Sequence, residues 1–195
     1  DRPEVFKQIM YILLNGCGAG YSVEKRFVDK LPTIKRRKEE TVTYTIEDSV
    51  EGWALAVDAL MMSFFNGSEQ IRFDGSLIRP EGAYISGGFK APGFQPLRRS
   101  LELIESLVNN RVNNGQEKLS TLDAHDIVCH IADAVLSGGI RRSALICLFD
   151  KDDDLMLKCK TGNWFYDNAQ RGRANNSIKL LKTDLTKEEF DNYKE

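Results

Sequence analysis

Apolar residues recur every three or four positions in several segments, the spacing that places them on one face of an α-helix. Residues 3–14 begin with Pro3, which suits a first helical turn, and continue with this spacing. Asp48 and Glu51 form a capping-box variant that predicts a second long helix, ending at Asn66 and Gly67. The same criteria predict further helices over residues 97–113, after the capping pair Ser120 and Asp123, over 153–160, and from 186.

Short runs rich in β-branched or apolar residues lie between these helices and predict strands over 21–23, 41–46, 70–73, 143–149 and 177–181. The run 143–149 is continuously apolar, which is typical of a strand buried on both faces. Residues 74–96 are dense in glycine and proline, and such long irregular segments are usually functional or mobile. Alternating helices and buried strands predict an α/β architecture with a largely parallel sheet.

The composition is that of a soluble globular chain: 195 residues, 42% hydrophobic and 29% charged, with a formal net charge of −2. This near balance argues against direct nucleic-acid binding, and no apolar run is long enough to span a membrane. The chain opens at Asp1 without a methionine or a signal peptide, so we expect a piece of a longer, cytoplasmic polypeptide.

The cysteines and histidines give no sign of a metal site or a nucleophile. The four cysteines do not occur in Cys-x-x-Cys pairs, and we interpret them as reduced thiols. His125 and His130 are five residues apart on one predicted helix, which does not direct both to one metal. No cysteine has an evident histidine partner, and Cys129 and Cys147 fit a helix face and a buried strand.

Three polar or glycine-rich segments are candidates for ligand contact. Residues 15–20 contain Gly-x-Gly-x-Gly, but the order helix, turn, strand excludes a dinucleotide fingerprint. Residues 137–143 join two glycines to two arginines, which suits a phosphate or carboxylate and equally a simple helix cap. Residues 168–177 combine amides, arginines and a glycine. Such a segment can bind the base and phosphates of a nucleotide, and it fits an ordinary polar loop equally well.

Taken together, these segments resemble adenosylcobalamin-dependent (class II) ribonucleotide reductases, with the monomeric, triphosphate-reducing branch as the nearest likeness. The resemblance runs in order from residue 1 to about residue 182. It is carried by six stretches, which are 14–23, Glu51-Gly52-Trp53-Ala54-Leu55-Ala56, Ile78-Arg79-Pro80-Glu81-Gly82-Ala83, Thr121-Leu122-Asp123-Ala124, 138–144 and Arg173-Ala174-Asn175-Asn176-Ser177.

The resemblance implies an α/β fold that is an incomplete part of a ten-stranded α/β barrel, over residues 1–182, with 183–195 starting a truncated helix. It implies reduction of ribonucleoside di- or triphosphates with adenosylcobalamin as cofactor, a deoxynucleotide effector and a thioredoxin-type reductant. Residues 39–96 resemble an insertion that helps to form the regulatory nucleotide site.

Particular residues follow from the same resemblance. Substrate contacts are implied for Ser22, Gly138 and Gly139. Residues 87–93 would lie near a first specificity loop and 168–176 would form a second. The implied effector-reading residues are Lys90, Gln170, Arg171, Arg173, Asn175 and Asn176.

The catalytic residues of the family are missing from this chain. The Asn-Pro-Cys-Gly-Glu pattern that carries the family's catalytic cysteine does not occur in this sequence, so we expect the chain to be inactive without the remaining polypeptide. Two alternatives remain: a fragment of a metal-dependent (class I) reductase, against which the stretches at 51–53 and 78–80 argue, and a stand-alone nucleotide-binding module.

Overall fold

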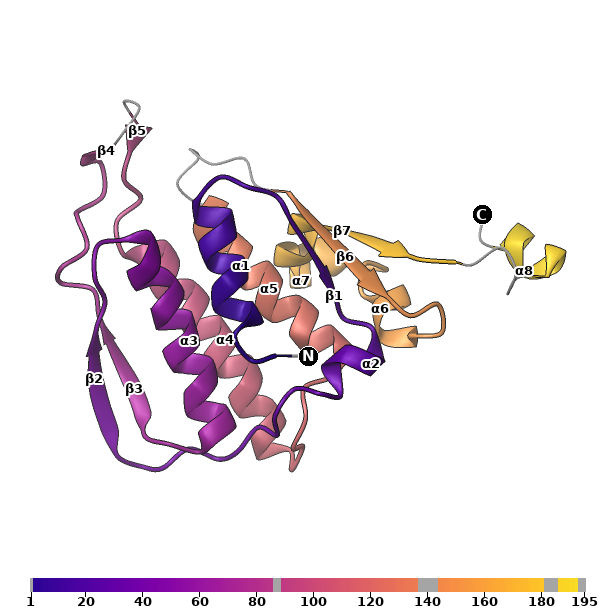
Figure 1. Ribbon diagram of the computed structural model, residues 1–195, viewed down its shortest axis with the longest axis horizontal. Coiled ribbons are helices and arrows are strands. Elements are labelled where there is room, and N and C mark those ends of the chain that lie inside the picture. Colours follow the sequence, from indigo (N-terminus) through magenta and orange to yellow (C-terminus); the bar gives the residue numbers. More distant parts are fainter. Residues whose placement is uncertain (1, 86–88, 137–143, 181–185, 193–195) are drawn as a thin grey trace.

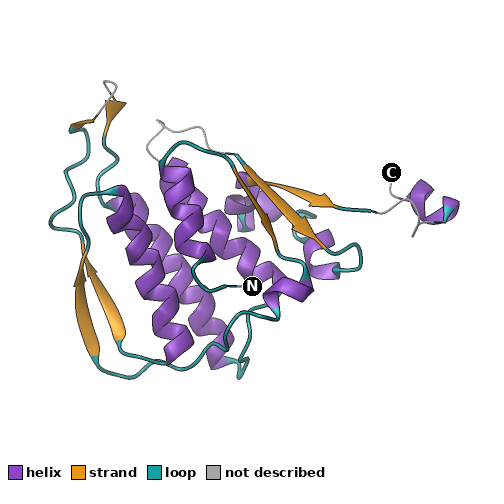
Figure 2. Cartoon of the chain, viewed as in Figure 1, coloured by secondary structure: helices purple, strands orange, loops and turns teal. Residues whose placement is uncertain are grey.

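Four long helices form the centre of the molecule in the computed structural model, which describes residues 2–85, 89–136, 144–180 and 186–192 (Figure 1). In Figure 2 these helices lie between a two-stranded sheet on one side and a three-stranded sheet on the other. The helices are α1 (Val5–Leu14), α3 (Val50–Asn66), α4 (Gln95–Asn113) and α5 (Thr121–Leu136).

All strands of the three-stranded sheet run parallel, in the order β1 (Ala19–Ser22), β6 (Leu145–Phe149), β7 (Ala174–Ile178). A parallel pair, β2 (Thr41–Thr45) and β3 (Gln70–Asp74), flanks α3, and β4 (Tyr84–Ile85) pairs antiparallel with β5 (Phe89–Lys90). The prediction of a mixed α/β fold with parallel sheets is confirmed. Within the described residues no sheet closes into a barrel.

Short helical segments complete the chain, and two of them correct the sequence prediction. The stretch 163–173, expected to be a loop, is largely helical, and β7 begins at Ala174 instead of residue 177. The short segments are α2 (Lys25–Val28), α6 (Asp154–Lys158), α7 (Trp164–Asp167), the 3₁₀ helix η2 (Ala169–Arg173) and α8 (Lys187–Asn192).

The hydrophobic core is formed mainly where the four long helices face one another and the three-stranded sheet. The predicted apolar faces are buried as expected, because each helix hides the side that carries the three-to-four spacing. The largest fully buried side chains include Phe6, Met10, Leu13, Leu60, Phe64, Leu97, Ile104, Ile127 and Leu145. None of the helices in the described part of the chain is long and apolar enough to cross a bilayer.

The ends of α3 show one cap that was predicted and one that was not. Gly67 ends the helix with φ 65°, a left-handed conformation that glycine adopts without strain. At the other end the cap is Ser49, whose Oγ accepts from the Gly52 amide at 2.9 Å. The predicted cap, Asp48, instead pairs with Arg79.

The continuous apolar run in β6 does not make a strand buried on both faces. Leu145 and Cys147 are buried, whereas Ile146 between them is 50% exposed. This alternation is typical of a sheet covered on one face. The expectation that this strand is buried on both faces was therefore wrong.

Candidate functional site

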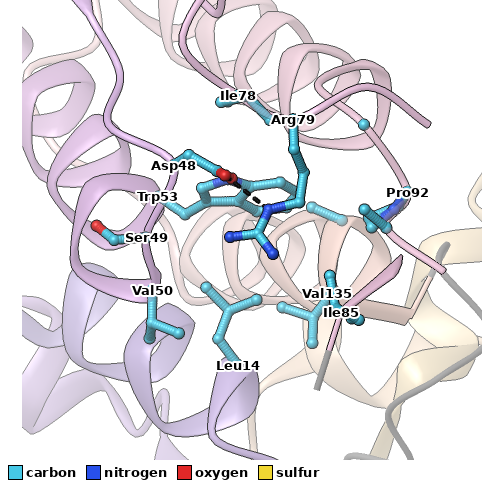
Figure 3. A pocket seen from close by; sticks show the side chains of 13 residues that line it. Leu14, Asp48, Ser49, Val50, Trp53, Ile78, Arg79, Ile85, Pro92 and Val135 are labelled. Atoms are coloured by element: carbon cyan, nitrogen blue, oxygen red, sulfur yellow. Dashed lines mark hydrogen bonds and ion pairs between the residues drawn. The ribbon is translucent and has the colours of Figure 1, made fainter. Parts of the chain in front are cut away.

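A cavity of about 320 Å³ opens beside the start of α3 (Figure 3). All but three of its 13 lining residues belong to the stretch 39–96, and the exceptions are Leu14, Ala134 and Val135. The Ser49 cap fixes the first turn of α3, and with it Trp53, against the segments on either side of the β4–β5 hairpin. The segment that the sequence associates with a regulatory site thus lines a nucleotide-sized hollow.

An ion pair lines this cavity. Arg79 Nε donates to Asp48 Oδ2 at 2.6 Å, and the two side chains are 42% and 31% exposed. Figure 3 shows the Arg79 guanidinium in the middle of the lining residues, in front of the Trp53 ring. A half-exposed guanidinium beside an aromatic and aliphatic wall suits a ligand that is flat and apolar at one end and whose anionic other end takes the place of the Asp48 carboxylate on Arg79.

Lys90, an expected effector-reading residue, lies beside this cavity. It is exposed on β5 and lines a hollow of about 360 Å³ that shares Ala91 and Pro92 with the first one. Lys90 and Arg79 bring two cations to this region, where Glu81 and Asp48 supply two carboxylates.

Ser22, an expected substrate residue, ends β1. Its Oγ donates to Glu24 Oε2 at 2.7 Å and accepts from the Glu24 amide at 3.1 Å. The hydrogen bond from Ser22, assisted by Arg26, lowers the pKa of Glu24. Ser22 and the glycines of residues 18–20 line a mainly apolar cavity of about 440 Å³ between β1, α1 and α5. Gly138 and Gly139 lie outside the described residues.

The arginines of the predicted second specificity loop both bind α5. Arg171 Nε and Nη2 each donate to the carboxylate of Asp126 at 2.7 Å, and Arg171 Nη1 donates to the Cys159 carbonyl at 2.9 Å. Arg173 Nε donates to Asp133 Oδ1 at 2.6 Å. The first pair is nearly buried, whereas the second is about two-fifths exposed.

The amides of this loop have more modest contacts. Gln170 Nε2 lies 3.5 Å from Asp126 Oδ1, Asn175 is exposed, and Asn176 Nδ2 donates to Cys159 Sγ at 3.2 Å. Neither the 320 Å³ cavity nor the 440 Å³ cavity is lined by residues 168–176. A nucleotide cavity shared by this loop and the glycine turns stays a prediction.

A buried polar chain was missed by the sequence reasoning, which found no histidine partner for any cysteine. Tyr21 Oη and His125 Nδ1 are 2.8 Å apart, and His125 Nε2 lies 3.6 Å from Cys129 Sγ. Burial lowers the pKa of His125 to about 4 and raises that of Cys129 to about 12. The imidazole is therefore neutral and the thiol protonated near pH 7, so the pair is not an activated nucleophile. Its signal was the i, i+4 spacing on α5.

The fold belongs to a class seen among solved proteins. The crystal structure of a B12-dependent (class II) ribonucleotide reductase superposes on 90% of this chain with a TM-score of 0.74 and 24% sequence identity. The match covers 28% of that chain. The mixed α/β arrangement is thus that of one part of such a reductase. No family model matches the sequence.

Curated relatives make the relationship specific. The adenosylcobalamin-dependent ribonucleoside-triphosphate reductase of Lactobacillus gasseri is 32% identical over 174 residues, 85% of this chain and 22% of the relative. That of Levilactobacillus brevis is 27% identical over 214 residues, 89% of this chain and 28% of the relative. The chain is homologous to adenosylcobalamin-dependent (class II) ribonucleotide reductases over most of its length, and it spans about a quarter of theirs.

Proposed function

We propose that this chain is part of a reductase that converts ribonucleotides to deoxyribonucleotides with adenosylcobalamin, and that its own task is to bind nucleotides. The observation that carries the proposal is the cavity at the start of α3, which is lined by the stretch related to a regulatory site and contains Trp53 and Arg79. In this proposal Trp53 packs against the base or sugar, and Arg79 holds a phosphate.

The remaining expected residues have matching roles. Ser22, Gly138 and Gly139 would contact the substrate, and Lys90 would add positive charge at the effector. Residues 168–176 would report the effector's identity to the substrate base. The rest of the polypeptide, a thioredoxin-type reductant and a cytoplasmic location belong to the same proposal.

The cofactor does not fit residues of this chain alone. Both histidines are buried in α5, and the cavities next to the glycine turn and α3 measure 440 and 320 Å³, a size for a nucleotide instead of a corrinoid. Adenosylcobalamin would supply the radical that starts the reaction. We assign no residue here to it and expect its site in the rest of the polypeptide.

The thiol chemistry also lies elsewhere in this proposal. Cys129, Cys147 and Cys159 are buried, and burial raises the pKa of the Cys147 thiol to about 12. Cys17 is exposed but lacks the family's catalytic sequence context. The chain alone, given adenosylcobalamin, a dithiol and a ribonucleoside triphosphate, should form no deoxynucleotide, and product formation would overturn this assignment.

Nucleotide binding is tested by calorimetry on the 195-residue chain with deoxyadenosine and thymidine triphosphates. Arg79→Gln should raise the dissociation constant about tenfold, or about 1.4 kcal/mol. Arg98→Gln is the matched control, because Arg98 also pairs with a carboxylate but lies on the exposed face of α4. Equal affinity in the wild-type and Arg79→Gln chains, or no binding by either, would refute the assignment of this cavity.

The stand-alone nucleotide-binding module remains the second candidate, because a large apolar core is buried within this chain itself. It differs from the first in one outcome: added flanking polypeptide of the reductase would leave nucleotide affinity unchanged. The names of the relatives argue against the class I alternative, because they are adenosylcobalamin-dependent reductases.

A further inference from the structure

Helix α5 carries two carboxylates that hold the predicted second specificity loop. Asp126 and Asp133 are seven residues apart, which places them on one face about two turns, or roughly 10 Å, from each other. They bind Arg171 and Arg173, which lie only two residues apart in η2. The two arginine side chains therefore attach the end of η2 to α5 at two levels of the helix.

The two attachments differ in strength and in access. Asp126 binds Arg171 through both oxygens, and the two side chains are only 9% and 12% exposed. A bidentate, desolvated pair of this kind fixes orientation as well as distance. Most of the Arg171 guanidinium is thus engaged within the protein, which leaves it little to offer a ligand. The Arg173 pair is much more exposed and can exchange its partner with a ligand phosphate.

Further contacts surround the same segment. Lys160 Nζ donates to the Ala174 carbonyl, where η2 passes into β7. A Cβ atom on Gly172 would lie 3.9 Å from the Trp164 ring, so this indole packs against η2 near its C-terminal end. Trp164 is therefore a local reporter for the position of the segment.

The C-terminal end of α5 reaches the cavity beside α3. Ala134 and Val135 line that cavity, and Asp133 precedes them directly. At the level of Asp126, the adjacent His125 binds Tyr21 of β1. One helix thus contacts the proposed nucleotide cavity, the specificity loop and the strand that ends in Ser22.

We propose that Asp126 is a positioning residue, which holds residues 168–173 through Arg171 so that the exposed Arg173 faces a nucleotide. The effect of this positioning on nucleotide binding rests on the proposed function. The positioning itself is a property of the chain and can be measured without a ligand.

The experiment uses the two tryptophans of the sequence as separate reporters. In the 195-residue chain labelled with 5-fluorotryptophan, the ¹⁹F resonance of Trp164 reports the loop and that of Trp53 reports the cavity. Asp126→Asn should shift or broaden the Trp164 resonance and leave that of Trp53 in place. The control Asp58→Asn breaks the Lys7–Asp58 pair between α1 and α3 and should leave Trp164 unchanged.

A second variant separates positioning from general stability. Asp126→Asn leaves Arg171 buried without its counter-charge, which lowers the melting temperature. In Asp126→Asn/Arg171→Gln that charge is gone, so the melting temperature should recover while the Trp164 resonance stays displaced. The ratio of dissociation constants for purine and pyrimidine deoxynucleotides should change about fivefold in both variants, the lower end of usual coupling between sites.

The outcomes distinguish this inference from the proposed function. An unchanged Trp164 resonance in Asp126→Asn, or an equal change in Asp58→Asn, would overturn the positioning role. Displacement of Trp164 without any nucleotide binding would uphold the positioning and refute the nucleotide site. If Asp126→Asn does not fold, the Asp126→Asn/Arg171→Gln chain takes its place, and an undisplaced Trp164 resonance in it would overturn the role equally.

Discussion

Gly52, in the first turn of α3, provides a test in which the packing reverses the usual effect of a substitution. Replacing glycine by alanine inside a helix normally stabilises a protein by about 1 kcal/mol. At this position a Cβ atom would lie 2.2 Å from the Glu47 carbonyl oxygen and 2.9 Å from the Glu47 carbonyl carbon. Because both atoms belong to the backbone, no side-chain rotation relieves the clash. We therefore expect Gly52→Ala to destabilise the chain.

The magnitude follows from three contributions. Moving the backbone at Glu47 to make room costs about 1–3 kcal/mol, as overpacking of a well-filled interior usually does. The movement also displaces Ser49, whose cap on the Gly52 amide is worth about 1 kcal/mol. Subtracting the propensity gain of about 1 kcal/mol leaves a net loss of about 2 kcal/mol. For a chain of this size the melting temperature should fall by roughly 4–8 °C.

The assay is equilibrium unfolding in urea, followed by circular dichroism, with a thermal melt as a second measurement. Gly20→Ala is the control, because a Cβ atom on Gly20 meets nothing within 4 Å, and its stability should stay within about 0.5 kcal/mol of the wild type. A Gly52→Ala chain as stable as the wild type, or more stable, would show that the reasoning from the Glu47 backbone is wrong.

Three further predictions concern His125, Arg173 and Cys17. Burial lowers the pKa of His125 from 6.5 to about 4, so between these pH values the unfolded chain binds more protons than the folded one. The contribution of His125 to stability is complete above pH 6.5 and falls by roughly 3 kcal/mol towards pH 4. Urea titrations at several pH values should find this dependence reduced in His125→Gln. Arg173→Ala should weaken the effector response of a reconstituted reductase but lower the melting temperature by only about 2 °C, because its ion pair is exposed. Cys17→Ser should retain turnover in the same enzyme, and complete loss would mean that Cys17 takes part in the redox chemistry.

The helices of the core were predictable because burial imposes a period on their sequences. In α1 the spacing of Phe6, Ile9, Met10 and Leu13 matches the face that is buried against the other helices. The end of α3 at Gly67 was equally readable, since few residues other than glycine adopt its left-handed conformation. Such features depend on neighbours within a few residues, which a sequence displays directly.

The start of β7 was not predictable in this way. Its first residues, Ala174, Asn175 and Asn176, have low strand propensity, so the pattern placed the strand three residues too late. They are extended because they pair with Leu145, Ile146 and Cys147 of β6. Pairing with a strand about 30 residues away outweighs the low local strand propensity, and no feature of the segment itself predicts that pairing.

The role of Arg171 lies between these two cases. Every residue of α5 from Ala124 to Val135 except Asp133 is buried, so the Asp126 carboxylate is cut off from solvent. A buried carboxylate requires a cationic partner, because desolvation of an unpaired charge is too costly. The sequence therefore contains the need for a partner but not its identity, since Arg171 is 45 residues away. A loop arginine that resembles a ligand-binding residue can thus be required by the fold, and the exposed Arg173 is the better candidate for direct contact with a nucleotide.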